Sequence, residues 1–340
     1  MQNNPLISII TPCYHSEKWI ERYLTCILNQ TYDNIELIVI NDGSTDETER
    51  IVLSYQKRFE EKGATLRYQW QQNKGLGGAI NTGLKLITGE YFTWCDSDNF
   101  YTNDYIETKK NFFEANPDID IVRCDGYVVF DSNIDKPIGF MSKRNIDKES
   151  QHLFLNALLI QNFHFGCAML KTKSFDQINP TRDIYESREG QNWQLMLPML
   201  YHYKCGYIDR QMFYFVIRKD SISNVAFQKG LKERVDQINE YIKILTVTLQ
   251  SMHLEKGEEQ NYIKLITVKY AKEKIKLAIS FNDIPLLVSQ QQLLKETQSL
   301  TVQDTLRYLN GRYILCHPLF YPLQQSAFRF GRKVKRMLVK

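Results

Sequence analysis

The 340-residue sequence lacks several features that mark whole classes of protein. No apolar run approaches the roughly 18 residues that a membrane-spanning helix needs, so no segment is predicted to cross a bilayer. The seven cysteines include no C-x-x-C pair, so neither a disulfide framework nor a zinc site is expected, and reduced core thiols are the predicted state. The formal net charge of +4 is too small to indicate a nucleic-acid binder.

The start of the chain also lacks the marks of a signal peptide. Met1 to Pro5 contain no basic residue, and the apolar residues that follow are typical of a first strand. We therefore expect a cytoplasmic protein. Hydrophobic residues make up 43% of the chain, enough for a large core, and the length allows one large domain or two ordinary ones.

What the sequence does contain, from its start, is an alternation of strand and helix patterns. Short apolar and β-branched runs at 6–10, 35–40, 64–70 and 91–94 are predicted strands, and the first three each lead into a segment with helical spacing of apolar residues. This order is typical of an α/β fold with a mainly parallel sheet flanked by helices.

Further strands are predicted at 120–130, 164–170 and 212–217, with helices between them. From about residue 226 the pattern changes to long helices with few strand signals. We therefore expect an α/β domain over 1–225 and a mostly helical region over 226–340.

Polar loops follow three of the predicted strands, at 12–17, 41–46 and 96–99. Open α/β sheets bind ligands beyond the carboxyl ends of their strands, so these loops should converge on one rim. Asp96 and Asp98, two residues apart in an extended backbone, can present their oxygens to one hard divalent cation. A solvated turn that closes a strand is the alternative interpretation of this pair.

Other motifs are less specific. The pattern Ser44-x-x-Glu47 predicts a capping box at the start of a helix. Gly75 to Gly78 resemble a dinucleotide fingerprint only in part, because Ile80 stands where that motif has its third glycine, and no P-loop is present. A nucleophilic role for the Cys95 thiol is an open alternative, although no histidine lies near it in sequence.

Four segments, taken in order, carry a resemblance to a known family. They are Ile7-Ser8-Ile9-Ile10-Thr11-Pro12-Cys13-Tyr14, Glu36 to Asp46, Asn73-Lys74-Gly75 with Ala79 to Gly83, and Gly89-Glu90-Tyr91 leading into Asp96-Ser97-Asp98. The chain resembles the inverting family 2 glycosyltransferases, which have the GT-A fold. The resemblance is close over about the first 100 residues and loose over 101–225.

The resemblance implies roles for individual residues on the donor side. Pro12, Tyr14 and Asp42 would line the nucleotide pocket, and Lys74 would lie beside the nucleotide. Glu17 belongs to the same rim loop and is a further candidate for donor binding.

The resemblance also places a metal ion. Asp98 would bind Mg²⁺ or Mn²⁺ directly, and Asp96 would contact ribose or a metal-bound water. Arg218 and Ser221 resemble the positions that contact the diphosphate in this family, with a solvated strand end as the alternative.

The sequence departs from the family pattern at the catalytic base. The family usually has a Glu-Asp pair at the start of the helix after 190, where this chain has Gln191-Asn192. A neutral amide cannot accept the acceptor's proton, so Asn192 would only orient the acceptor. Glu189 or Glu186 would replace the base, with Glu189 favoured. An ordinary carboxylate stabilised by the helix dipole is the alternative for Glu189.

The resulting prediction is a metal-dependent inverting glycosyltransferase that moves a sugar from a nucleotide donor to a hydroxyl of a glycan. The expected donor is a UDP-sugar, and the expected role is in cell-surface polysaccharide synthesis. Two alternatives stay open: a nucleotidyltransferase on a similar core, and a non-catalytic protein that binds nucleotide sugars. No nucleic-acid partner is expected.

The last thirteen residues, 328–340, alternate basic and apolar side chains and contain no acid. Such a segment is typical of attachment to an anionic lipid surface, and it suggests a lipid-linked acceptor and a peripheral position on the inner face of the membrane. A solvated, frayed terminus is the alternative. Deletion of 328–340 should therefore move the protein from the membrane fraction to the soluble fraction in cell fractionation; an unchanged distribution contradicts attachment by this segment.

Overall fold

The computed structural model describes residues 4–144, 153–159, 167–218 and 230–312. The chain forms two compact units: the first comprises the described residues up to 218 together with Val247–His253, and the second comprises 230–246 and 254–312. The predicted domain boundary at 225/226 lies outside the described residues and stays a prediction. Within the part of the chain that is described, no helix is long and apolar enough to cross a membrane.

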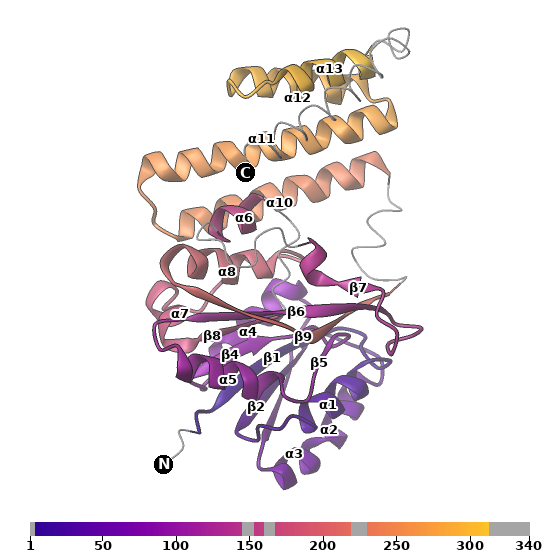
Figure 1. Cartoon of the computed structure of the whole chain (residues 1–340). Helices are drawn as coiled ribbons and strands as arrows, with labels where there is room; N and C mark the ends of the chain where they lie inside the picture. Colours follow the sequence, from indigo (N-terminus) through magenta and orange to yellow (C-terminus); the bar gives the residue numbers. More distant parts are fainter. Residues whose placement is uncertain (1–3, 145–152, 160–166, 219–229, 313–340) are drawn as a thin grey trace. The chain divides into compact units, whose positions relative to one another are not determined.

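The first unit is built on one mixed sheet with the strand order β3-β2-β1-β4-β8-β6-β9-β5, and β7 pairs with β6 (Figure 1). The strands are β1 (Ile7–Cys13), β2 (Ile35–Asn41), β3 (Thr65–Trp70), β4 (Tyr91–Trp94), β5 (Phe100–Tyr101), β6 (Ile121–Phe130), β7 (Gly139–Phe140), β8 (Ala168–Lys171) and β9 (Cys205–Ile217).

Strands β1 to β4 form a parallel half-sheet with β1 at its centre. Ile7 of β1 pairs with Ile35 of β2 on one side and with Tyr91 of β4 on the other. Because these strands run in the same direction, their carboxyl ends and the loops that follow them lie at one edge of the sheet. β8 is antiparallel to both β4 and β6, and β9 runs parallel to β6.

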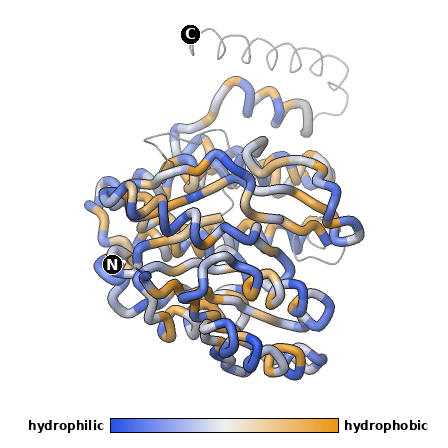
Figure 2. Tube along the Cα trace, turned by 60° about the horizontal axis from the view of Figure 1, so that its bottom comes forward, coloured by the Kyte–Doolittle hydropathy of each residue, from blue (hydrophilic) through white to orange (hydrophobic). Residues whose placement is uncertain are grey.

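Helices cover the sheet on both faces. They are α1 (Ile20–Leu28), α2 (Thr48–Ser54), α3 (Gln56–Lys62), α4 (Gly75–Leu86), α5 (Tyr105–Ala115), α6 (Leu153–Leu159), α7 (Thr172–Ile178) and α8 (Gln191–His202), and a 3₁₀ turn spans Met141–Arg144. Side chains of α1, α2, α3 and α5 share a buried cluster with the side chains of Ile7 and Ile9, whereas α4 packs on Ile10, which points to the opposite face. Hydrophobic and hydrophilic residues accordingly alternate along the helices (Figure 2).

The predicted capping box at Ser44-x-x-Glu47 is wrong. The Ser44 hydroxyl accepts a hydrogen bond from the backbone N–H of His15 at 3.0 Å, so it is committed to the neighbouring loop. Helix α2 instead begins at Thr48, whose N–H donates to the Asp46 carboxylate at 3.2 Å. The Ser44 hydroxyl is therefore engaged in a tertiary contact with His15, and it does not cap α2 as the pattern predicted.

The second unit consists of α10 (Leu231–Ser251), whose last turn belongs to the first unit, α11 (Lys256–Phe281), α12 (Ile284–Glu296) and α13 (Val302–Arg312). Apolar residues of α11 and α12 form its buried cluster. Asp283 caps α12 by accepting a hydrogen bond from the Leu286 N–H at 2.8 Å, and the buried Asp304 pairs with Lys272 at 3.0 Å. The C-terminal region is helical, as the sequence predicts, as far as it is described.

The close packing of α4 against β1 leads to a prediction about stability. A Cβ added at Gly83 would lie 2.4 Å from a methyl carbon of Ile10, whereas a Cβ at Gly257, also helical, would meet nothing within 4 Å. Gly83→Ala should therefore lower the free energy of unfolding by about 1–3 kcal/mol through overpacking. Gly257→Ala is the matched control, because helix propensity alone should raise stability by about 0.5–1 kcal/mol. Urea denaturation measures both, and equal stabilisation by the two variants contradicts this packing.

Candidate functional site

Hydrogen bonds join the loops that follow β1, β2 and β4. The hydroxyls of Ser16 and Ser97, both buried, lie 2.8 Å apart and connect the first loop to the Asp96–Asp98 turn. The N–H of Ser16 donates to Thr48 at the start of α2, and the N–H of Asp42 donates to the Cys13 carbonyl at 2.8 Å. The structure thus brings together three polar loops that are up to 80 residues apart in sequence.

Asp42 is buried and held in one orientation. Its Oδ1 accepts hydrogen bonds from the Gln71 amide at 2.7 Å and from the backbone N–H of Lys74 at 2.9 Å. The other carboxylate oxygen, Oδ2, takes part in neither bond and can accept from a ligand. Gln71 was not predicted, and only its place at the end of the third strand could have indicated it.

The loop after β1 presents Tyr14 outward. Pro12 is buried in the strand end, while the Tyr14 side chain is 55% exposed and makes an edge contact with His15 at 4.2 Å between ring centroids. Glu17 is exposed, and its carboxylate accepts a hydrogen bond from the Glu47 N–H at 3.1 Å. The Tyr14 side chain is therefore accessible to a ligand, whereas Glu17 is engaged in fixing the loop.

The glycines at the start of α4 serve close packing. The N–H of Gly77 donates to the Ser187 carbonyl at 2.8 Å, and a Cβ on Gly77 would lie 2.7 Å from the Ser187 nitrogen. Gly78 leaves room for the stem of the exposed Lys74 side chain, which lies across the first helical turn. These contacts join the Lys74 loop to the segment that carries Glu186 and Glu189.

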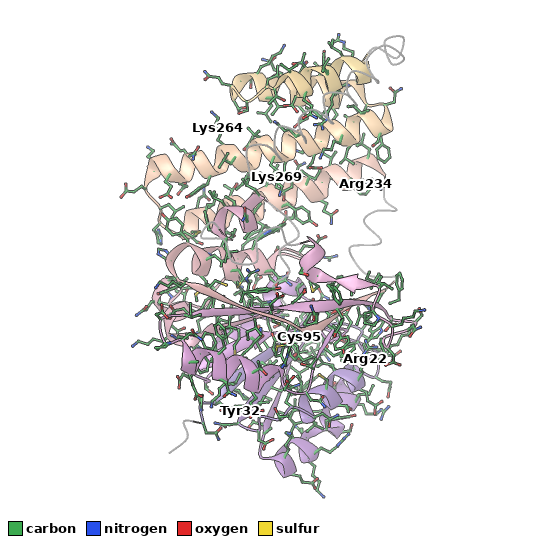
Figure 3. All side chains as sticks on the ribbon, in the orientation of Figure 1. Arg22, Tyr32, Cys95, Arg234, Lys264 and Lys269 are labelled. Carbon is green, nitrogen blue, oxygen red and sulfur yellow. The ribbon has the colours of Figure 1, made fainter. Side chains whose placement is uncertain are left out.

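Asp96 and Asp98 lie at the partly buried end of β4 (Figure 3 labels the adjoining Cys95). Burial raises the pKa of Asp96 to about 7, and the charge of Asp98 adds to this rise while Arg218 opposes it. The pKa of Asp98 is also raised by burial, against the opposing charges of Arg218 and Arg22. Two carboxylates in such a position are stabilised by a cation.

A positive charge does contact this pair. The Nε of Arg218 lies 2.8 Å from Oδ2 of Asp98, so a guanidinium contacts this carboxylate directly. The two carboxylates are the oxygen donors that Mg²⁺ and Mn²⁺ prefer. Among the described residues, no group of three or more His, Cys, Asp or Glu side chains is arranged to hold a metal. Ser221 lies outside the described residues.

The side chain of Asn192, at the start of α8, is engaged. Its Oδ1 accepts a hydrogen bond from the indole Nε1–H of Trp94 at 2.7 Å. Trp94 belongs to β4, and only Cys95 separates it from the Asp96–Asp98 turn. The amide is therefore fixed beside that turn and cannot act as a base. Trp94 was assigned to a buried strand from the sequence, and nothing in that pattern predicted this bond.

The two candidate bases lie in the segment before α8. Glu186 is exposed, and Glu189 is half-buried next to Gly190, which has a positive φ of 80°. The Ser187 hydroxyl donates to the Glu189 carbonyl at 2.5 Å, which holds the turn between them. Their assignment as bases stays a prediction.

The thiols near the site are not nucleophiles. Burial raises the pKa of Cys13 to about 12 and that of Cys95 well above its usual value. A protonated, buried thiol is inert. The six cysteines in the described residues are all free, as the sequence predicts; Cys316 lies outside them.

Comparisons with known proteins agree with this site. The model of the family "Glycosyl transferase family 2" matches residues 8–178, half of the chain. An uncharacterized glycosyltransferase of Rickettsia prowazekii is 35% identical over 49% of this chain and 50% of its own length. Glycosyltransferase GlyA of Streptococcus pneumoniae is 31% identical over 70% of this chain and 34% of its own length. The matches therefore span half or less of these relatives.

Solved structures share the fold at low sequence identity. TarS residues 1–349 of S. aureus, in complex with UDP-GlcNAc, align with a TM-score of 0.63 at 16% identity, covering 96% of this chain and 92% of TarS 1–349. The mannosyltransferase PcManGT of Pyrobaculum calidifontis, in complex with GDP-Man and Mn²⁺, aligns with a TM-score of 0.53 at 15% identity, covering 100% of this chain and 89% of its own. The GT-A fold predicted from the sequence is confirmed, and the chain belongs to glycosyl transferase family 2.

Proposed function

We propose that the protein is a metal-dependent inverting glycosyltransferase that uses a UDP-sugar as donor and a glycan hydroxyl as acceptor. The observation that carries this proposal is the convergence, on one edge of the parallel half-sheet, of the oriented Asp42 carboxylate with the Asp96–Asp98 pair. The first can bind a nucleoside and the second a cation on its diphosphate. Structural relatives bind UDP-GlcNAc and GDP-Man with Mn²⁺.

On the donor side, Oδ2 of Asp42 would accept hydrogen bonds from the base, and Tyr14 would lie against it. Asp98 would hold Mg²⁺ or Mn²⁺, and Asp96 would contact ribose or a metal-bound water. The cation would neutralise the charge that the diphosphate gains as the glycosidic bond breaks. Lys74 and Arg218 would add positive charge beside the diphosphate and stabilise the negative charge that develops there.

On the acceptor side, inversion in one displacement needs a base opposite the leaving group. Since the Asn192 oxygen is bonded to Trp94, the proposal assigns the proton to a carboxylate of the preceding segment, Glu189 before Glu186. Asn192 then orients the acceptor through its Nδ2 group. The contact of this segment with Gly77 couples the position of the base to the donor loop.

The engaged Asn192 also favours a second candidate, a non-catalytic protein that binds nucleotide sugars. Donor binding without hydrolysis or transfer across a broad panel of acceptors would support it. The family match disfavours the nucleotidyltransferase alternative, which would release pyrophosphate rather than a nucleoside diphosphate. Acceptor class, a role in polysaccharide synthesis and attachment to a membrane through 328–340 stay proposals from the sequence.

Donor binding can be tested by thermal stability. UDP-sugars should raise the Tm, more so with Mn²⁺, because selective binding to the folded state adds about 2.7 kcal/mol at a concentration of about 100 Kd. Asp98→Asn should remove the increment due to Mn²⁺, and Asp42→Asn should weaken the nucleotide effect in both conditions. Asp118→Asn is the matched control, because that exposed aspartate pairs with Lys204 at 2.9 Å and lies away from the rim. Equal shifts in all four proteins would count against this site.

The base assignment predicts a rate effect. Glu189→Gln should lower kcat by about 10²–10⁴-fold with little change in donor affinity, because general-base catalysis contributes about that much. Adding Asn192→Asp to that variant should restore part of the rate, since a carboxylate can still accept the Trp94 N–H. Glu186→Gln is the comparison. Full activity in both single glutamate variants, measured by release of nucleoside diphosphate, contradicts the assignment.

A further inference from the structure

Asp98 belongs to a closed ring of contacts among five residues. Its Oδ2 contacts Nε of Arg218 at 2.8 Å, and the Arg218 guanidinium lies over the Trp19 ring at 4.0 Å from the centroid. The indole Nε1–H of Trp19 donates to Asp131 at 3.1 Å, and Asp131 pairs with Arg22 at 3.3 Å. Arg22 closes the ring by donating to the backbone carbonyl of Asp98 at 2.8 Å.

The ring joins four separate parts of the first unit. Trp19 and Arg22 flank the start of α1 (Figure 3 labels Arg22), Asp98 follows β4, Asp131 follows β6 and Arg218 follows β9. Backbone contacts reinforce it: the N–H of Asp131 donates to the Ile217 carbonyl at 3.1 Å. The position of Arg218 is therefore set by its neighbours and is not that of a side chain extended into solvent.

The charged side chains of this ring form two oppositely charged pairs. Asp131 and Arg22 balance each other, and Trp19 offers a ring face that attracts a guanidinium. The side chains of Asp98 and Arg218 are only 17% and 20% exposed, so their attraction is weakly screened by water. A divalent ion bound to the same carboxylate and this guanidinium would repel each other at short range.

We propose that Arg218 is the resident counter-ion of Asp98 in the metal-free protein, and that Trp19, Asp131 and Arg22 are positioning residues that hold it there. The inference rests on the proposed function, because it assumes that Asp98 binds the metal. For a metal ion to bind, Arg218 must move away from Oδ2 of Asp98. A bound nucleoside diphosphate would then offer the displaced guanidinium a new anionic partner. Metal and nucleotide then bind cooperatively, each raising the affinity for the other by the same factor.

Titration of free Mn²⁺ by electron paramagnetic resonance, with and without UDP, tests this. In the native protein, UDP should raise Mn²⁺ affinity by a factor in the range of about 5–150. Arg218→Gln should raise Mn²⁺ affinity about tenfold or more without UDP and reduce the factor due to UDP. Trp19→Leu should raise Mn²⁺ affinity without UDP severalfold, although no charge is lost. Trp19→Phe, which keeps an aromatic ring face, should have a Mn²⁺ affinity near that of the native protein. Near-ultraviolet circular dichroism verifies that each variant is folded.

Arg210→Gln is the control for loss of a positive charge, because Arg210 pairs with Asp104 and is outside the ring; its Mn²⁺ affinity should equal that of the native protein. If Asp98→Asn fails to weaken Mn²⁺ binding in the presence of UDP, the metal assignment fails and the inference fails with it. If Asp98→Asn does weaken it, but Arg218→Gln and Trp19→Leu leave Mn²⁺ affinity without UDP unchanged, the inference alone is overturned.

Discussion

Two carboxylates held two residues apart, at the partly buried end of β4, create the electrostatic constraint on which the site depends. Burial raises the pKa of both carboxyl groups, and the charge of Asp98 raises that of Asp96 further, so the turn is most stable with a positive charge beside it. In the protein alone that charge comes from Arg218, which a tryptophan face and a second ion pair hold in place. A site of this kind is prepared for a cation before any ligand arrives.

The proposed donor side and acceptor side of the rim differ in what their hydrogen bonds do. Asp42 is oriented by two hydrogen bonds, and Ser16 and Ser97 connect the loops that follow β1 and β4. On the acceptor side, Trp94 occupies the oxygen of Asn192. The chain thus keeps the donor-side motifs that resemble those of its family but has Asn192 where the family usually has an acidic residue, so donor binding and transfer need separate tests.

Much of this arrangement was predictable from the sequence, because it depends on local patterns. Apolar runs predicted the parallel strands, and the order of strands and helices predicted one rim for Asp42, Asp96 and Asp98. The capping box failed because Ser44 bonds to His15, 29 residues away in sequence. Periodicity tells which face a residue occupies but not which residue it meets there.

The ring around Asp98 was unpredictable for the same reason. No local pattern relates Trp19 to Asp131, yet the indole Nε1 of Trp19 lies 3.1 Å from the Asp131 carboxylate although 112 residues separate them. The glycines of α4 are a similar case: they match a dinucleotide fingerprint only in part, and two of them allow close contact with residues 185–188, which no sequence pattern predicted. Only the tertiary structure distinguishes these roles.

The most direct test of the account is an anomalous difference map from crystals of the protein grown with Mn²⁺ and UDP. The account predicts a manganese peak coordinated by the Asp98 carboxylate and by diphosphate oxygens, with UDP bound beside Asp42 and Arg218 moved away from Oδ2. A map with UDP bound but no manganese at Asp98, and with Arg218 still paired to it, would contradict the central claim.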